Sequence, residues 1–91
     1  MQLVWTSKAL DDLARLYEFL APVDRRAAAR VVQSLTAAPS RIIEHPRIGE
    51  RLEEFAPREV RRIIAGHYEM RYELQNSTIF ILRLWHTREN R

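Results

Sequence analysis

Apolar and polar residues follow a helical period in the first half of the chain and a strand period in the second half. Residues 7–20 carry apolar side chains at steps of three and four, which predicts an amphipathic helix after a short strand at residues 2–5. The helical period returns after Asp24, a favourable N-cap, and continues past Pro39 to a last turn near Glu44. Because a proline inside a helix removes a hydrogen bond and clashes with the preceding turn, we expect a kink or a break at Pro39.

The polar and apolar side chains of the two predicted helices lie on opposite faces, a polar outer face and an apolar inner face. The outer face holds Asp11, Asp12, Arg15 and Glu18 on the first helix, and Arg25, Arg26, Arg30 and Gln33 on the second. The inner face of the second helix is a stripe of small and branched residues: Ala27, Ala28, Val31, Val32, Leu35 and Ala38. Small residues let two helices approach closely, so we expect a compact helical hairpin.

Alternation with a period of two marks three strands in the second half, at residues 59–65, 67–74 and 78–85. The last strand is apolar on both faces, which predicts an interior position in the sheet. The predicted fold class is α+β, with one strand, a helical hairpin and a three-stranded antiparallel meander in a single domain of residues 1–91. The two helices then cover one face of a mostly antiparallel sheet.

The other face of this sheet needs water or a partner, because two helices cover only one face. The side chains that alternation assigns to the helices are Tyr68, Met70, Tyr72, Phe80, Leu82 and Leu84. The side chains that it assigns to the open face are Arg71, Glu73, Ile79, Ile81, Arg83 and Trp85. An apolar strip framed by arginines is typical of a binding surface. The alternative is that residues 50–58 fold back and cover this face.

Composition narrows the class of protein. The chain has 91 residues, a net charge of +3, no cysteine, and fourteen arginines among its fifteen basic residues. Arginine makes bidentate contacts with carboxylate and phosphate groups, although a high arginine content also arises from genomic base composition. The longest apolar run, residues 79–82, is far shorter than a membrane span, and no export signal is visible, so we expect a cytoplasmic protein.

Few residues offer catalytic or metal-binding chemistry. The three histidines lie far apart in the sequence without carboxylates at ligand spacing, and there is no glycine-rich phosphate loop, so we expect neither a metal nor a cofactor. His86 stands within five residues of Arg83, Arg88 and Arg91, an arrangement that RNA transesterification could use and that an ordinary surface also shows. Arg61 and Arg62 are adjacent on a strand and point to opposite faces, and the pattern leaves open which of them joins the open face.

These residues together resemble the RelE/ParE superfamily of type II toxins. The resemblance covers the whole chain and rests on Trp5, Ala9, Asp12-Leu13, Tyr17, His45-Pro46, Ile48-Gly49, Arg62, Tyr68 to Tyr72 and Arg83-Leu84-Trp85-His86. It implies a small bacterial toxin that a cognate antitoxin neutralises by wrapping a disordered segment around it. We expect that segment on the open face, at Arg71, Ile79, Ile81, Arg83 and Trp85.

The superfamily has two activities, and the residues favour one of them. RelE-like members cut mRNA on the ribosome, whereas ParE-like members inhibit DNA gyrase and cleave no nucleic acid. An arginine follows the aromatic residue that opens the third strand in nuclease branches, but here Tyr68 is followed by Glu69, which would repel a phosphate. We therefore expect a ParE-like gyrase inhibitor. If the chain is a nuclease, the candidate catalytic residues are Arg61, Arg62, His86 and Arg88; a non-toxic relic that still binds antitoxin is a further alternative.

Overall fold

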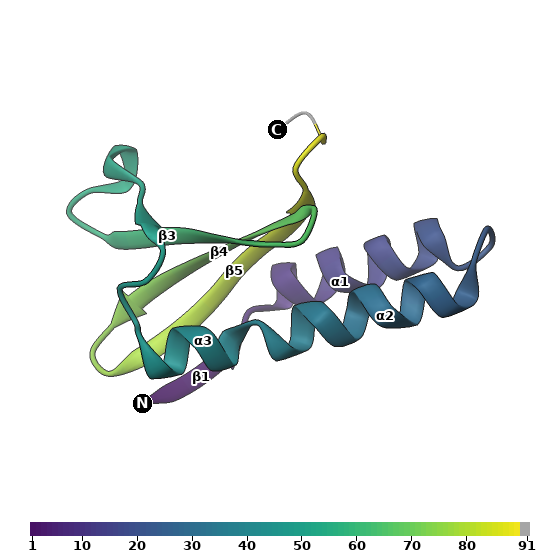
Figure 1. Ribbon diagram of the computed structural model, residues 1–91. Coiled ribbons are helices and arrows are strands. Elements are labelled where there is room, and N and C mark those ends of the chain that lie inside the picture. Colours follow the sequence, from purple (N-terminus) through teal and green to yellow (C-terminus); the bar gives the residue numbers. More distant parts are fainter. Residues whose placement is uncertain (90–91) are drawn as a thin grey trace.

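The computed structural model describes residues 1–89, and its elements follow the predicted order (Figure 1). The helices are α1 (Ser7–Leu20), α2 (Arg25–Ala37) and α3 (Pro39–Glu44). The strands are β1 (Gln2–Trp5), β2 (Glu50–Arg51), β3 (Glu59–Ala65), β4 (Tyr68–Gln75) and β5 (Thr78–His86), with a 3-10 turn, η1 (Glu53–Phe55), before β3. The α+β class is confirmed. None of the helices within the described residues is long and apolar enough to cross a membrane.

Capping side chains and one proline set the helix boundaries. The Thr6 hydroxyl oxygen accepts a hydrogen bond from the Ala9 N–H at 3.2 Å, and the Asp24 carboxylate accepts one from the Ala27 N–H at 3.0 Å. Pro39 is the first residue of α3, a position where a helix needs no N–H donor, so the predicted break is confirmed. The α1–α2 hairpin reaches well beyond the end of the sheet (Figure 1).

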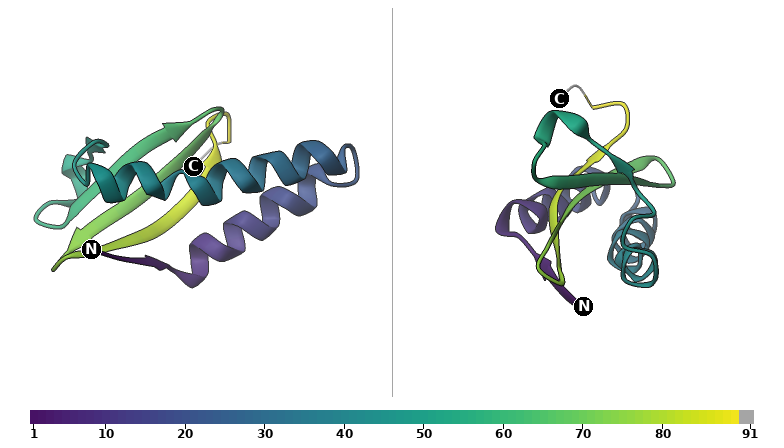
Figure 2. Two further views of the ribbon diagram at one scale, coloured as in Figure 1. Left: turned by 60° about the horizontal axis from the view of Figure 1, so that its bottom comes forward. Right: turned by 90° about the vertical axis from the view of Figure 1, so that its left-hand side faces the viewer.

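The sheet has the strand order β1-β5-β4-β3-β2. β1 runs parallel to β5, and the other neighbours are antiparallel. β5 therefore lies between two strands, which confirms the interior position predicted from its two apolar faces. α1 packs against β5 and α2, and Figure 2 shows these helices and the sheet from two further sides.

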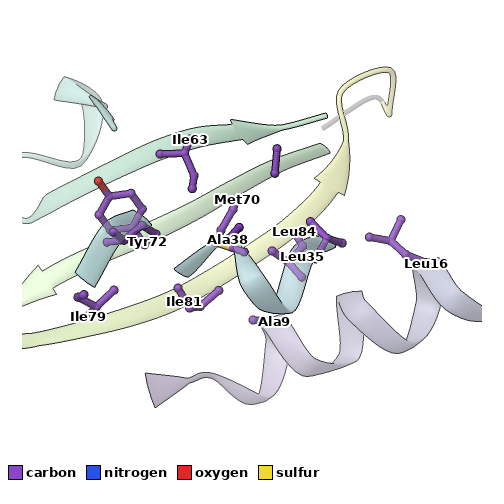
Figure 3. Close-up of a cluster of buried hydrophobic side chains, with 12 residues drawn as sticks. Ala9, Leu16, Leu35, Ala38, Ile63, Met70, Tyr72, Ile79, Ile81 and Leu84 are labelled. Carbon is purple, nitrogen blue, oxygen red and sulfur yellow. The ribbon is translucent and has the colours of Figure 1, made fainter. Parts of the chain in front are cut away.

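The core lies between the hairpin and the helix-facing side of the sheet (Figure 3). Its buried residues are Ala9, Leu16, Leu35, Ala38, Ile42, Ile63, Ala65, Met70, Tyr72, Ile79, Ile81 and Leu84. Met70, Tyr72 and Leu84 face the helices as predicted. Ile79 and Ile81 do so as well, with no exposed surface, so their predicted position on the open face is wrong. Phe80, predicted to face the helices, instead lies on the opposite face beside Glu73.

A β-bulge in β5 is the physical reason for this difference. Arg71 of β4 pairs with Arg83, but the next residue, Tyr72, pairs with Ile81, so Leu82 is an extra residue in the ladder. The alternation of side chains between the two faces therefore shifts by one position at Leu82. A strict period of two, applied backwards from Leu84, therefore puts the side chains of β5 that precede the bulge on the wrong face.

The segment that follows β2 covers half of the face opposite the helices. Leu52 is buried and donates its N–H to the Val60 carbonyl at 2.8 Å, and Val60 has no exposed surface. Arg58 donates two hydrogen bonds to Glu73, at 2.7 and 3.1 Å. Residues 50–58 thus fold back as the alternative proposed, but only over the half of the sheet near the start of β3. The half near the end of β3 stays open, with Ile64 about half exposed.

Candidate functional site

Three arginines on neighbouring strands form a row across the open half of the sheet. Arg62 of β3 pairs with Arg71 of β4, which pairs with Arg83 of β5. We call these three residues the arginine row. The next row toward the end of β3 contains Ile64, Glu69 and Trp85. The open half of the sheet therefore carries a row of cations beside a row in which Ile64 is exposed and Glu69 and Trp85 are buried. Three of the residues that the sequence predicts for this face, Arg71, Arg83 and Trp85, lie in these two rows.

Carboxylates around the row offset the repulsion between neighbouring arginines. Arg62 bonds to Glu50 at 2.7 Å and to Glu69 at 3.2 Å, and Arg71 lies 3.5 Å from the other oxygen of Glu69. The hydrogen bond and charge of Glu50, together with the charge of Glu69, raise the pKa of Arg62. Glu69 is almost fully buried. Its carboxylate therefore acts within this network, between Arg62 and Arg71.

Asp12 holds the third arginine of the row. Its carboxylate accepts hydrogen bonds from Arg83 at 2.8 and 3.1 Å and from the Leu84 N–H at 2.9 Å. β1 ends at Trp5, so the backbone of β5 beyond Ile81 keeps only β4 as a strand neighbour, and Asp12 supplies an acceptor for the Leu84 N–H. The predicted place of Asp12 on the outer face of the first helix is wrong, because it is 5% exposed. Its hydrogen bond raises the pKa of Arg83.

Arg71 is held between two aromatic rings. Its guanidinium carbon lies 5.2 Å from the ring centre of Phe55 and 4.7 Å from that of Trp85. Such contacts stabilise a cation over the face of an aromatic ring. Trp85 is itself only 7% exposed. Within the described part of the chain, Arg71 Nε and Glu69 Oε2 are buried without a hydrogen-bond partner.

His86 and Arg88 lie on the opposite side of the sheet, beside the helices. The His86 Nδ1 accepts a hydrogen bond from the Arg88 N–H at 3.0 Å, and the His86 ring packs edge-on against Tyr68 at 5.2 Å. Burial and the charge of Glu89 raise the pKa of Tyr68. These residues line a cavity of about 360 Å³. The other residues that line it are Arg15, Leu16, Phe19, Leu20 and Glu89.

Arg61 serves the loop that precedes β2. It donates a hydrogen bond to the Gly49 carbonyl at 2.7 Å and one to Glu59 at 2.9 Å. Tyr72 fastens the same loop, because its hydroxyl donates to the Pro46 carbonyl at 2.8 Å and accepts from the Gly49 N–H at 3.0 Å. Arg61 pairs with Tyr72 across the strands and shares its helix-facing side, so Arg62 is the arginine that joins the open face.

The four candidate nuclease residues therefore occupy three different places. His86 and Arg88 share the cavity beside α1, Arg61 holds the loop before β2, and Arg62 lies on the opposite face with two carboxylate partners. Among the five residues predicted to bind antitoxin, Arg71, Arg83 and Trp85 lie on the open face. Ile79 and Ile81 belong to the core.

The sequence contained weak signals for the residues that prediction missed. Asp12 is one of the positions that carry the resemblance, yet the helical period alone gives it an outward position. Phe55 lies in a stretch without a clear period, so nothing in the sequence places it over Arg71. Ile64 lies two residues after Arg62 in β3, so the two side chains point to the same face of the sheet. Alternation along β3 would therefore have placed Ile64 on the open face once Arg62 was assigned there.

The sequence of this chain matches known proteins over almost its whole length. The sequence model of one family, described as the ParE toxin of the type II toxin-antitoxin system parDE, matches residues 3–91. The chain belongs to the ParE toxin family. The Toxin RelE2 of Caulobacter vibrioides (strain ATCC 19089 / CIP 103742 / CB 15) is 31% identical over 85 residues, which is 93% of each chain.

A solved structure shares the fold of this ParE-family chain. It is described as the chromosomal ParDE TA system from P. aeruginosa, and it matches with a TM-score of 0.79 at 22% identity, over 94% of this chain and 95% of the other. The resemblance to the RelE/ParE superfamily is thereby confirmed, and the chain is a toxin of a type II toxin-antitoxin system.

Proposed function

We propose that this ParE-family toxin inhibits DNA gyrase in the cytoplasm, cleaves no RNA, and is neutralised by a cognate antitoxin that binds the open half of the sheet. The separation of the four candidate nuclease residues supports the absence of RNA cleavage, and membership of the ParE toxin family is the reason for naming gyrase as the target. A ribonuclease has to bring a proton-transfer group and phosphate-binding cations to one scissile bond. Here His86 shares its cavity with Arg15 and Arg88, whereas Arg61 lies outside that cavity and Arg62 is on the other side of the sheet with Glu50 and Glu69.

The antitoxin surface follows from charge and exposure on the open half. Arg62 and Arg83 keep 41% and 34% of their side chains exposed, and Ile64 beside them is 48% exposed. An acidic, leucine-rich segment that folds on binding can pair its carboxylates with these arginines and place an apolar residue on Ile64. Arg71, fixed between Phe55 and Trp85, offers a rigid cation that loses little side-chain freedom when bound.

Two assays on the purified toxin test the target. In the first, gyrase supercoils relaxed plasmid with rising amounts of toxin; in the second, a cell-free translation reaction is scored for cuts in its mRNA. We expect loss of supercoiling and intact mRNA. Cut mRNA with unaffected gyrase would contradict the proposal, and inactivity in both assays, with no growth arrest on expression without antitoxin, would favour a non-toxic relic.

A titration of the antitoxin's C-terminal peptide tests the surface. We expect Arg71→Ala to weaken binding by more than about 1 kcal/mol, roughly fivefold, because it removes the cation at the centre of the face. Arg26→Ala is the matched control, since Arg26 is an exposed arginine on α2, and it should leave the affinity unchanged. Equal affinities of all three proteins would mean that the antitoxin binds elsewhere.

A second candidate function is cleavage of mRNA in the cavity that holds His86 and Arg88. One observation favours it: both residues and Tyr68 line the same cavity, with the His86 Nε2 not used by the bond to Arg88. If this function is the true one, His86→Ala abolishes mRNA cutting in the translation assay. Glu69→Arg is a poor test, because Glu69 is buried and bonded to Arg62, so that change would also disturb the fold.

A further inference from the structure

The positive charge of the chain is concentrated on the second and third helices. Residues 25–43 contain four arginines and no carboxylate. The other positions together hold eleven basic and twelve acidic residues, so they carry a net charge of −1 against +3 for the whole chain. The excess charge of this protein is thus a local property of one helical segment.

The arginines of α2 differ from most other arginines of residues 1–89 in lacking a carboxylate partner. Eight arginines in this part of the chain lie within 4.0 Å of a carboxylate: Arg15, Arg47, Arg51, Arg58, Arg61, Arg62, Arg71 and Arg83. Within residues 1–89, no ion pair or hydrogen bond involves the side chains of Arg25, Arg26 or Arg30, and all three residues are exposed. They therefore present three uncompensated charges to solvent on one helix.

Stability does not account for these three positions. Arg25 and Arg26 are the first two residues of α2, and the first turn contains no acidic side chain. The amide groups at a helix N-terminus already carry a partial positive charge, so cations there are unfavourable. The helix terminus instead adds to the positive potential of the arginines. A ligand that is anionic would relieve this repulsion.

The neighbouring side chains indicate which kind of anion fits. Gln33 and Ala37 continue the side of α2 that carries Arg26 and Arg30, at steps of about one helical turn. All four residues are exposed. The side of α2 that carries Arg26 and Arg30 has no large apolar side chain, whereas protein interfaces are anchored by buried aromatic or aliphatic groups. Contacts with a nucleic-acid backbone are made chiefly by exposed basic and polar side chains. Small side chains such as Ala37 let the helix approach closely.

We propose that the outer face of α2, at Arg25, Arg26 and Arg30, binds the phosphate backbone of nucleic acid independently of base sequence. This face lies on the helical hairpin, which reaches beyond the sheet (Figure 1), and none of its residues belongs to the arginine row. The toxin can therefore hold nucleic acid while its sheet face holds a protein. The inference goes beyond inhibition of gyrase and does not depend on it.

Direct binding of nucleic acid by the isolated toxin tests this proposal. The probes are a DNA duplex of about 30 base pairs with arbitrary sequence and a single-stranded RNA of equal length, each followed by fluorescence anisotropy. Three phosphate contacts predict that log K falls against log salt with a slope of about −2.7 for the duplex and about −2.1 for the single strand, so a fourfold rise in salt weakens binding roughly 40-fold and roughly 20-fold, respectively. Either probe binding in this way supports the proposal, and their ratio shows which nucleic acid is preferred.

Two triple variants separate this face from overall charge. Replacing Arg25, Arg26 and Arg30 by alanine should weaken binding more than about tenfold and remove most of the salt slope. Alanine favours helices, so the melting temperature should not fall. The control replaces Lys8, Arg47 and Arg51 by alanine, removes the same charge, and should stay within about threefold of the parent. Its melting temperature is measured as well, because Arg47 and Arg51 are paired with Glu59 and Glu53.

A third variant and a third probe complete the test. Replacing the same three arginines by lysine keeps the charges and should keep the salt slope. The proposal is overturned if the two alanine triples lose affinity equally, or if binding does not depend on salt. It is also overturned if polyglutamate binds as tightly as DNA through these arginines, since the face would then recognise an acidic protein.

Discussion

Asp12 offers the sharpest test of how the open face is held together. Asp12→Asn removes the charge that faces Arg83 and leaves one carbonyl oxygen in place of two carboxylate oxygens. In the native protein these oxygens accept two hydrogen bonds from Arg83 and one from the Leu84 N–H. The amide can keep one or two of the three bonds, but it cannot keep the charge.

The magnitude follows from these contacts. A hydrogen bond to a charged group contributes about 1.5 to 3 kcal/mol, and Arg83 is 34% exposed, so water compensates part of its loss. We therefore expect Asp12→Asn to lower the free energy of unfolding by about 2 kcal/mol. A domain of this length has a total of about 5 to 14 kcal/mol, so the change is easily resolved.

The assay is urea unfolding followed by tryptophan fluorescence, and the neighbouring residue provides the control. Asp11 is exposed on the same helix, so Asp11→Asn should change the unfolding free energy by less than about 0.5 kcal/mol. If Asp12→Asn is no more destabilising than Asp11→Asn, Asp12 does not hold β5. The contact between Asp12 and Arg83 would then not stabilise the arginine row.

Three further predictions concern the loop before β2. Gly49→Ala should destabilise the fold more than Gly66→Ala, because a Cβ at position 49 would lie 2.6 Å from the Arg62 carbonyl oxygen, whereas at Gly66 only the positive φ of +63° opposes the change; thermal melting ranks the two. Tyr72→Phe should cost about 1 to 3 kcal/mol in urea unfolding, because two buried backbone groups lose their partner. Burial alone would raise the pKa of Glu59, but hydrogen bonds from Arg61 and Arg47 lower it below the usual 4.5. The ionised form is thus stabilised by folding. Its contribution is present above pH 4.5 and is lost as the pH falls below that value, so the parent should lose more stability between pH 7 and acid than Glu59→Gln, in urea titrations at each pH.

The helices and strands could be predicted because their signals are local. Thr6 and Asp24 cap helices that their own neighbours define, and Pro39 breaks a helix wherever it falls. The assignment of faces in β5 failed because it depends on a bulge at Leu82, which only the pairing with β4 creates. A pattern with period two is correct on either side of such a bulge and wrong across it.

The face of the sheet that carries the candidate residues could be predicted better than the full set of residues on it. Three predicted residues, Arg71, Arg83 and Trp85, lie on the face where alternation placed them. Arg83 and Trp85 follow the bulge in β5, and Arg71 lies on β4, so the bulge does not change their faces. Asp12 was misplaced because a helical period treats every carboxylate as solvent-facing, and its partner Arg83 lies 71 residues away in sequence. Long-range ion pairs of this kind leave no periodic trace in a single sequence.

The measurement that tests the central claim most directly compares His86→Ala with the parent toxin in the gyrase supercoiling assay. The account predicts that both proteins inhibit supercoiling at the same concentration and that neither cuts mRNA during translation, because His86 belongs to a cavity that the proposed activity does not use. A parent toxin that cuts mRNA and leaves gyrase active, together with an inactive His86→Ala variant of unchanged stability, would contradict it.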